Sequence, residues 1–439
     1  MNLVSRPDTN VAHEVGLVLQ RQRHLVRKFD LDRLDFHLGY LHFGRGEWSK
    51  ALAAFERLGD RHVQPGTRGP WGKEPNVNVL RVADECRRKL GQEVKATTAV
   101  SPPIISSPAP IGVFAGPELY FAVDGGRVWV LDDTGLYKYD PGTGPAKRIE
   151  IGLQRLSREY PQPYNILVSS IEVAAGKVWI GTRTKGLISF DQTTGAISNY
   201  SVAEGLLMPN VSALLPAGNR LWIGFGNEVS NLGLYPGGLG FLDLARNEFV
   251  GLESELPKGL SRTPSRGATD RHLSVLGDAP RTYITKFARA PKGQMWALTR
   301  YGIIEFPATQ TNSWKRLTNS PASVNTGHPP GLVASDRYLA VVAPDPTGLA
   351  IYSLPNYECR YVKEIDGLPN NSVRSIALDG DKAWVGGKGY VALVDLPSAR
   401  VEKVCKLRAT FSVRSMLFAD GNVWFSCGPG LYRMPANAN

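Results

Sequence analysis

His272 and Glu228 are the two residues that could most readily perform acid–base chemistry together. Residues 113–439 contain only two histidines, His272 and His328, and each stands in a polar segment rich in turn-forming residues. A hydrolase or lyase needs an imidazole or a carboxylate within hydrogen-bond reach of its substrate. His272 could supply the imidazole and Glu228 the carboxylate, provided that the two segments that carry them meet on one face of the fold.

The sequence contains no other catalytic pattern. We find no Gly-x-Ser-x-Gly elbow, no His-Glu-x-x-His motif and no phosphate-binding glycine loop. We therefore predict that the protein is not an enzyme and that it binds no cofactor. A hydrolase or lyase that acts through His272 is the alternative.

Metal binding is not expected either. The four cysteines stand far apart and form no Cys-x-x-Cys pair, which argues against a zinc site and favours buried core cysteines, although disulfide pairing stays open. Asp140 and Asp191 each begin a short turn that ends in Thr-Gly. A calcium loop needs several carboxylates close together, so we interpret these aspartates as turn residues that accept backbone hydrogen bonds. The cysteines are Cys86, Cys359, Cys405 and Cys427.

A repeat must position whatever chemistry the chain performs. Its units centre on a tryptophan within a β-rich segment, and most neighbouring units stand about 40–50 residues apart, a period typical of closed β arrays. A less regular copy, residues 333–342, places Leu339 at the tryptophan position. The tryptophans are Trp129, Trp179, Trp222, Trp296, Trp384 and Trp424.

Each unit is predicted to form four strands, and seven such units predict a mainly β protein with a seven-bladed β-propeller. In the sixth unit we expect strands at Val373–Leu378, Ala383–Gly386, Tyr390–Asp395 and Val401–Cys405. The tryptophan of each second strand is interpreted as a packing residue between neighbouring blades.

The units resemble the two-component regulator propeller family. Gly367-Leu368-Pro369-Asn370-Asn371-Ser372-Val373 matches the opening of that family's unit, and Trp179-Ile180-Gly181 followed by Gly186-Leu187 matches its later half. The resemblance extends over the propeller and implies the sensory part of a membrane-bound regulator. The sequence shows no membrane-spanning run, kinase or DNA-binding module alongside it.

Residues 1–95 are predicted to form a small helical domain before the propeller. We expect helices over residues 10–29, from Asp30 or Asp32 to Phe43, over residues 48–58 and over residues 77–90. Residues 38–55 resemble a tetratricopeptide repeat through Leu38, Gly39, Gly46, Trp48, Ala51 and Phe55. The resemblance implies protein–protein contact, with a purely structural cap as the alternative.

Residues 96–112 form a Pro/Ser-rich linker, and the propeller is predicted over residues 113–439. The last unit ends after its third strand, so its fourth strand must come from elsewhere in the chain. The candidates are residues 103–107 and residues 111–114, and we predict that one of them pairs beside residues 430–434 and closes the ring.

The candidate binding face carries the long connections between strands. In an antiparallel blade the second-to-third and the fourth-to-first connections share one face. The insertions at residues 225–238 and 252–282, and the long connections 152–165 and 318–331, all belong to these two kinds. The candidate ligand-binding residues there are Asn227, Glu228, Asn231, Tyr235, Arg262, Arg266, Arg271, His272 and His328.

We expect this face to bind a protein or peptide, with a glycan or small molecule as alternatives. The net charge of +11 is dispersed along the chain, so nucleic acid is not expected. No apolar run of membrane-spanning length and no apolar signal core occur. These features predict a cytoplasmic protein without membrane insertion, or a periplasmic or extracellular one if residues precede this N-terminus.

Overall fold

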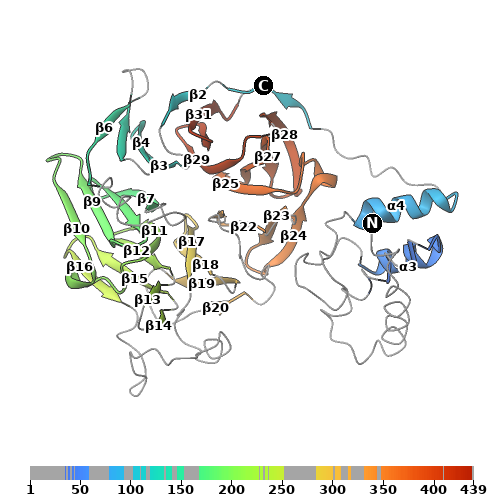
Figure 1. The fold of residues 1–439 in the computed structure, drawn as a ribbon, viewed down its shortest axis with the longest axis horizontal. Helices are drawn as coiled ribbons and strands as arrows, with labels where there is room; N and C mark the ends of the chain where they lie inside the picture. The colour runs from blue at the N-terminus through green and yellow to red at the C-terminus, as the bar shows by residue number, and fades with distance from the viewer. Residues whose placement is uncertain are drawn as a thin grey trace, which may run out of the picture. The chain divides into compact units, whose positions relative to one another are not determined.

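A computed structural model defines the fold (Figure 1). It describes residues 35, 38–39, 42–43, 45–58, 79–92, 102–108, 110–114, 119–132, 135–140, 146–152, 168–226, 228–230, 233–235, 237–251, 283–299, 302–307, 315–317, 331–343, 348–408 and 410–437. The chain divides into two units, Met1–Ala99 and Val100–Asn439.

The first unit contains two described helices, α3 (Trp48–Leu58) and α4 (Val79–Lys89), and helical backbone at five positions before them. Ala51 and Phe55 of α3 pack with Ala83 and Cys86 of α4. A Cβ atom on Gly39 would lie 2.5 Å from the Phe55 ring, so glycine permits this close approach. The predicted helices over residues 48–58 and 77–90 are thus observed, whereas the one over residues 10–29 lies outside the described residues.

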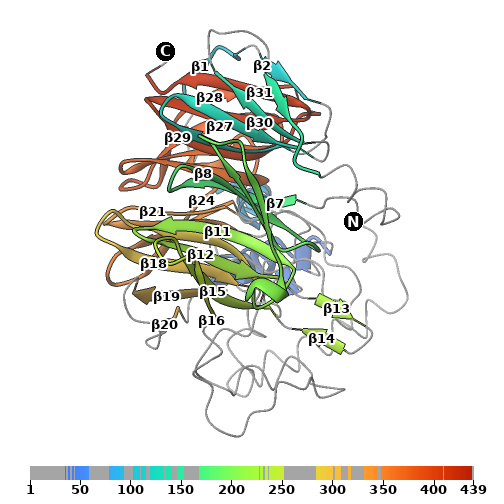
Figure 2. The same ribbon diagram turned by 90° about the vertical axis from the view of Figure 1, so that its left-hand side faces the viewer.

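The second unit is a ring of seven sheets, each built from strands in antiparallel order, with one added parallel strand in blade six (Figure 1 and Figure 2). This ring confirms the predicted propeller. Blade one consists of β3 (Tyr120–Asp124), β4 (Arg127–Leu131), β5 (Leu136–Tyr139) and β6 (Lys147–Ile149). Blade two consists of β7 (Val168–Ala174), β8 (Lys177–Thr182), β9 (Leu187–Asp191) and β10 (Ile197–Tyr200). Blade three consists of β11 (Val211–Ala217), β12 (Arg220–Phe225), β15 (Gly238–Asp243) and β16 (Glu248–Gly251).

The remaining four blades complete the ring. Blade four consists of β17 (Ile284–Arg289), β18 (Gln294–Thr299), β19 (Gly302–Pro307) and β20 (Lys315–Arg316). Blade five consists of β21 (Leu332–Ala334), β22 (Tyr338–Val342), β23 (Leu349–Ser353) and β24 (Glu358–Val362). Blade six contains β25 (Val373–Asp379), β26 (Lys382–Gly387), β27 (Tyr390–Asp395) and β28 (Arg400–Lys406), and blade seven contains β29 (Val413–Ala419), β30 (Asn422–Cys427) and β31 (Gly430–Pro435).

Two strands that precede blade one pair with strands of the last two blades. β2 (Pro110–Val113) pairs antiparallel with β31 and supplies the missing fourth strand of blade seven, as predicted for the second of the two candidates. The first candidate does not pair there: β1 (Ile104–Ile105) instead pairs parallel with β28 and adds a fifth strand to blade six. Blade seven needs only one strand, and β1 covers the exposed outer edge of blade six.

The repeated tryptophans hold neighbouring blades together, as the sequence predicted. All six are at most 2% exposed, and Trp424 packs against Phe121 and Val128 of blade one, which joins the end of the ring to its start. In blades two, three and six the residue two positions after the tryptophan is a glycine, which allows the next blade to approach closely. A Cβ atom on Gly224 would lie 2.7 Å from Ile284 of the next blade, so the inner strand of that blade would have to move.

The assignment of Leu339 to the tryptophan position of blade five is wrong by one residue. Leu354 N donates a hydrogen bond to Arg337 O, just as Leu396 N donates to Asp381 O in blade six, which aligns Ala340 with Trp384. Leu339 therefore lies on the other side of its strand and packs with Trp296 of blade four. Ala340 faces blade six together with Ile351, its partner across the strand pair.

Candidate functional site

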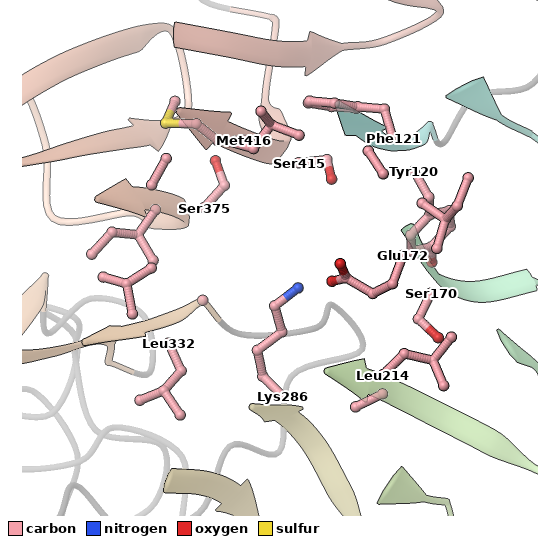
Figure 3. A pocket seen from close by; sticks show the side chains of 18 of the residues that line it. Tyr120, Phe121, Ser170, Glu172, Leu214, Lys286, Leu332, Ser375, Ser415 and Met416 are labelled. Carbon is pink, nitrogen blue, oxygen red and sulfur yellow. The ribbon is translucent and has the colours of Figure 1, made fainter. Parts of the chain in front are cut away.

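The inner strands of all seven blades surround a central channel with a cavity volume of about 410 Å³ (Figure 3). We define the central channel by these strands, which are β3, β7, β11, β17, β21, β25 and β29. Each fourth-to-first connection leads directly into the inner strand of the next blade. All inner strands therefore begin on the predicted binding face, and one mouth of the channel opens there.

A bulge interrupts five inner strands one residue after their start, in blades two, three, four, six and seven. A bulge bends the strand and turns its side chains in a new direction. The bulged residues are Ser169, Ser212, Thr285, Arg374 and Arg414. This position therefore brings hydroxyl groups and two cations to the lining of the channel near its loop-bearing mouth.

Most hydroxyl groups of the lining bond to backbone. Ser212 Oγ lies 2.6 Å from Ile284 O and 3.0 Å from Gly224 O, so it joins blade three to blade four. Ser375 Oγ donates to Val413 O at 3.1 Å and joins blade six to blade seven. Thr285 Oγ1 donates to Leu298 O at 3.0 Å within its own blade. We interpret these three groups as structural.

Glu172 and Lys286 are the two charged residues that point toward each other inside the central channel (Figure 3). Glu172 lies on β7 of blade two and Lys286 on β17 of blade four. Within the described residues, neither side chain makes a hydrogen bond or an ion pair, so a gap separates the carboxylate from the ammonium group. Arg374 and Arg414 also line the channel, so its described lining contains three cations and one carboxyl group.

Glu172 occupies a position that is apolar in every other blade. It stands opposite Trp179 in the strand pair, and the corresponding inner-strand residues are alanine, valine or leucine. They are Ala122, Leu215, Ala288, Val333, Ala377 and Leu417. An ionisable side chain at this position is therefore not needed to build a blade.

The surroundings of Glu172 favour its neutral form. Burial among the inner strands raises the pKa of Glu172 to about 7, although the positive charge of Lys286 acts in the opposite direction. Burial also raises the pKa of Tyr120, at the start of β3 in the same lining. A carboxyl group with such a pKa can exchange its proton near neutral pH, which is a property of functional sites.

The predicted loop residues are only partly placed. Glu228 lies in β13 (Glu228–Ser230) and Tyr235 in β14 (Gly233–Tyr235), a hairpin inserted between β12 and β15 where the sequence suggested a loop. The side chains of these two residues, and the whole of Asn227, Asn231, Arg262, Arg266, Arg271, His272 and His328, lie outside the described part of the structure. The proposed meeting of His272 with Glu228 is therefore untested.

Glu172 and Lys286 were not among the candidate residues predicted from the sequence. A signal for Glu172 was present, because aligning the repeats places a single carboxyl group in a column of alanine, valine and leucine. Lys286 occupies a more variable column, and its approach to Glu172 depends on how the ring closes. No group of three or more His, Cys, Asp or Glu side chains suited to a metal occurs among the described residues, in which all four cysteines are free.

The fold is shared with many solved structures, although no family model and no curated protein matches the chain. The extracellular domain of a hybrid two component system from B. thetaiotaomicron matches with a TM-score of 0.51 and 17% identity, over 76% of this chain and 42% of that domain. This chain thus spans less than half of that domain. An inactive virginiamycin B lyase from Staphylococcus aureus, solved with quinupristin, gives a TM-score of 0.50 and 12% identity over 74% and 97% of the two chains.

The Pan2 WD40 domain of Neurospora crassa matches equally well, with a TM-score of 0.50 and 13% identity over 76% and 97% of the two chains. At these identities the comparisons establish the fold alone. The chain thus shares its β-propeller fold with the extracellular domain of a two component system, with the lyase and with the WD40 domain. None of the described helices is long and apolar enough to cross a membrane.

Proposed function

We propose that the protein is a non-catalytic binding domain of the sensor type. Its propeller recognises a ligand at the face that carries the long connections, and part of that ligand enters the central channel. The observation that carries this proposal is the cavity of about 410 Å³ at the centre of the ring, which lies in the size range of small-molecule sites. Its charged lining is not required for packing, and long loops on a rigid scaffold are a common place for recognition.

The size of the cavity limits what enters it. A small molecule, a terminal sugar or a single side chain of a peptide fits, whereas the bulk of a protein or glycan partner would stay on the loops. The helical segment, residues 1–95, is proposed to contact a second protein. The packing of α3 on α4 through Ala51, Phe55 and Ala83 is compatible with this role.

A pair of tryptophan substitutions tests the role of the channel. Ser415 points into the channel and its side chain makes no hydrogen bond in the described structure, so Ser415→Trp should narrow the cavity with little effect on folding. Ser198→Trp places the same side chain on the exposed outer strand β10 and serves as the control. A library of small molecules, peptides and glycans is screened against the full chain by thermal shift.

Ligands found in this screen should lose binding in Ser415→Trp and keep it in Ser198→Trp. Equal binding to both variants would exclude the channel, and an empty screen would count against the binding function as a whole. For the helical segment, the full chain and a chain without residues 1–95 are used as baits. A partner retained only by the full chain supports the second contact, whereas identical partners would contradict it.

A hydrolase or lyase is the second candidate function, now with Glu172 as the base. The observation in its favour is a carboxyl group with a pKa of about 7 in a cavity beside a cation. Turnover by such an enzyme should increase as the pH rises through 7 and should disappear in Glu172→Gln. Turnover that survives this substitution would exclude Glu172 as the base.

A further inference from the structure

We infer that the central channel binds a small organic anion, a carboxylate on an apolar body, which Lys286 holds through its ammonium group while the protonated carboxyl group of Glu172 donates a hydrogen bond to it. This inference rests on the proposed binding function and specifies the class of ligand. It assigns Glu172 and Lys286 to one site, although they belong to blades two and four.

The gap between the two side chains is the place inferred for the ligand carboxylate. Glu172 and Lys286 point toward each other across the cavity, and neither has a hydrogen-bond partner among the described residues (Figure 3). A ligand carboxylate has two oxygen atoms, so one can accept from the ammonium group and the other from the carboxylic acid. Hydrogen bonds that involve a charged partner are roughly twice as strong as neutral ones.

The charge of the lining favours an anion over a cation. Four residues of the described lining besides Glu172 carry ionisable groups: Lys286 on β17, Arg374 on β25, Arg414 on β29 and Tyr120 on β3. When Glu172 is protonated, the charged side chain that points toward it across the cavity is the cation Lys286. When it is ionised, its negative charge opposes a bound carboxylate directly.

The rest of the cavity suits an apolar body. Apolar residues from six blades belong to the lining, and the volume of about 410 Å³ is large enough for a fused two-ring molecule. Burial of this part of the ligand supplies affinity, whereas the charged pair fixes its orientation. The apolar lining residues are Phe121, Ile171, Leu214, Leu332, Ile376 and Met416.

The protonation of Glu172 gives the site a defined pH dependence. Because the pKa of Glu172 is about 7 in the folded protein, the donor form predominates at pH 6 and is scarce at pH 8. An anion that needs this proton should bind about tenfold more tightly at pH 6 than at pH 8. A ligand with an ammonium group facing Glu172 would show the opposite dependence.

Calorimetric titration of the full chain with 2-naphthoate tests the inference. The controls are 2-naphthamide, which is neutral, and 2-naphthylmethylamine, which is a cation of similar size. We expect 2-naphthoate to bind at least about tenfold more tightly than either control at pH 6, since hydrogen bonds to charged groups contribute about 1.5–3 kcal/mol. Preference for the amine, or no preference, would overturn the assignment of an anion.

Variants separate the roles of the two side chains. Lys286→Met should weaken 2-naphthoate binding at least about tenfold, whereas Lys292→Met, in the exposed turn at the other end of the same blade, should leave it unchanged. Glu172→Gln keeps a hydrogen-bond donor, so binding should remain strong and become equal at pH 6 and pH 8. Lys286→Gln provides a second test should Lys286→Met fail to fold.

Two results would contradict the site itself. Unchanged binding in Lys286→Met and Lys286→Gln would exclude the ammonium group, and a tenfold pH dependence that persists in Glu172→Gln would exclude the carboxyl group. If none of the three probes binds, the inferred ligand class is wrong. Ligands from the library screen that respond to Ser415→Trp would then still support the binding function.

Discussion

Glu172 links the stability of the propeller to pH. Burial raises its pKa from 4.5 to about 7 in the folded protein, so the folded state binds the proton more tightly than the unfolded state does. Below pH 4.5 the carboxyl group is mostly protonated in both states, so it does not lower the free energy of unfolding. As the pH rises from 4.5 to 7, the group ionises more readily in the unfolded state and destabilises the fold increasingly. A shift of this size corresponds to about 3 kcal/mol above pH 7.

Glu172→Gln should remove this pH-dependent destabilisation of the fold. We expect the variant to exceed the original protein in free energy of unfolding by up to about 3 kcal/mol at pH 8 and to match it at pH 4.5. Urea denaturation at the two pH values measures the difference. Glu358→Gln, an exposed glutamate on β24, is the control and should have no effect at either pH. A constant difference at both pH values would contradict the titration of Glu172.

The other ionisable groups with large shifts are structural residues. Burial raises the pKa of Cys405 and of Cys427 to about 11, so both thiols remain protonated at neutral pH and behave as core residues. The interpretation of the cysteines as buried core residues is confirmed for Cys86, Cys405 and Cys427, whereas Cys359 is half-buried. Glu172 differs from them because its side chain faces an open cavity rather than a packed core.

At the scale of elements, blade five shows how the repeat tolerates loss of its tryptophan. Ala340 stands at the tryptophan position, and the space toward blade six is filled by Ile351 from the neighbouring strand. In blade two the residue opposite Trp179 is the smaller Ser189. In blade two the large residue, Trp179, lies on the second strand, and in blade five the large residue, Ile351, lies on the third strand. In both blades the residue opposite it is small.

This exchange of volume predicts the behaviour of two substitutions. Ala340→Trp overfills the space beside Ile351 and should lower the free energy of unfolding by about 1–3 kcal/mol. Ile351→Ser alone should also destabilise the fold, because it leaves a cavity and a buried hydroxyl group. The double variant reproduces the pair found in blade two and should be more stable than the sum of the single effects, as measured by a double-mutant cycle. Additive effects would contradict the exchange.

The sequence was a reliable guide to elements whose pattern is local. The four strands expected in the sixth unit correspond to β25, β26, β27 and β28 within two residues. The errors arose where local pattern carries no information. Alternation alone did not determine whether Leu339 or Ala340 faces blade six, since a slip of one residue reverses the two faces of a strand.

The proposed pair of Glu172 and Lys286 could not be predicted from a local sequence pattern. Glu172 could be recognised as an exception within its column of the repeat, but Lys286 could not, because tyrosine, serine, alanine and glycine occupy the corresponding positions. Only closure of the ring brings β7 and β17 to the same cavity. The long loops remain the predicted entrance to the channel.

At the scale of the whole molecule, β1 and β2 bring the two ends of the propeller together. β2 completes blade seven through its pairing with β31, and Phe114, just after β2, packs with Trp424 and Leu431. β1 adds an outer strand to a blade that already has four. The two strands should therefore contribute unequally to stability.

Deletion of residues 100–115 should abolish cooperative unfolding of the propeller, because it removes the closing strand of blade seven. Replacement of residues 102–108 by a Gly/Ser linker of equal length removes β1 alone and should lower the melting temperature only modestly. Calorimetry of the full-length variants measures both effects. Unchanged unfolding of the deletion variant, or equal effects of the two changes, would contradict the proposed role of β2.

The pairing of β2 with β31 also has a consequence for synthesis of the chain. The ribosome makes β2 about 320 residues before β31, which corresponds to tens of seconds at about 5–20 residues per second. During this time the nascent chain exposes the unpaired edge of β2 and the edges of the blades already made. Such unpaired strand edges are sites for association with other chains. Completion of the ring is therefore a late event, and we expect newly made chains to depend on chaperones until their last strand has left the ribosome.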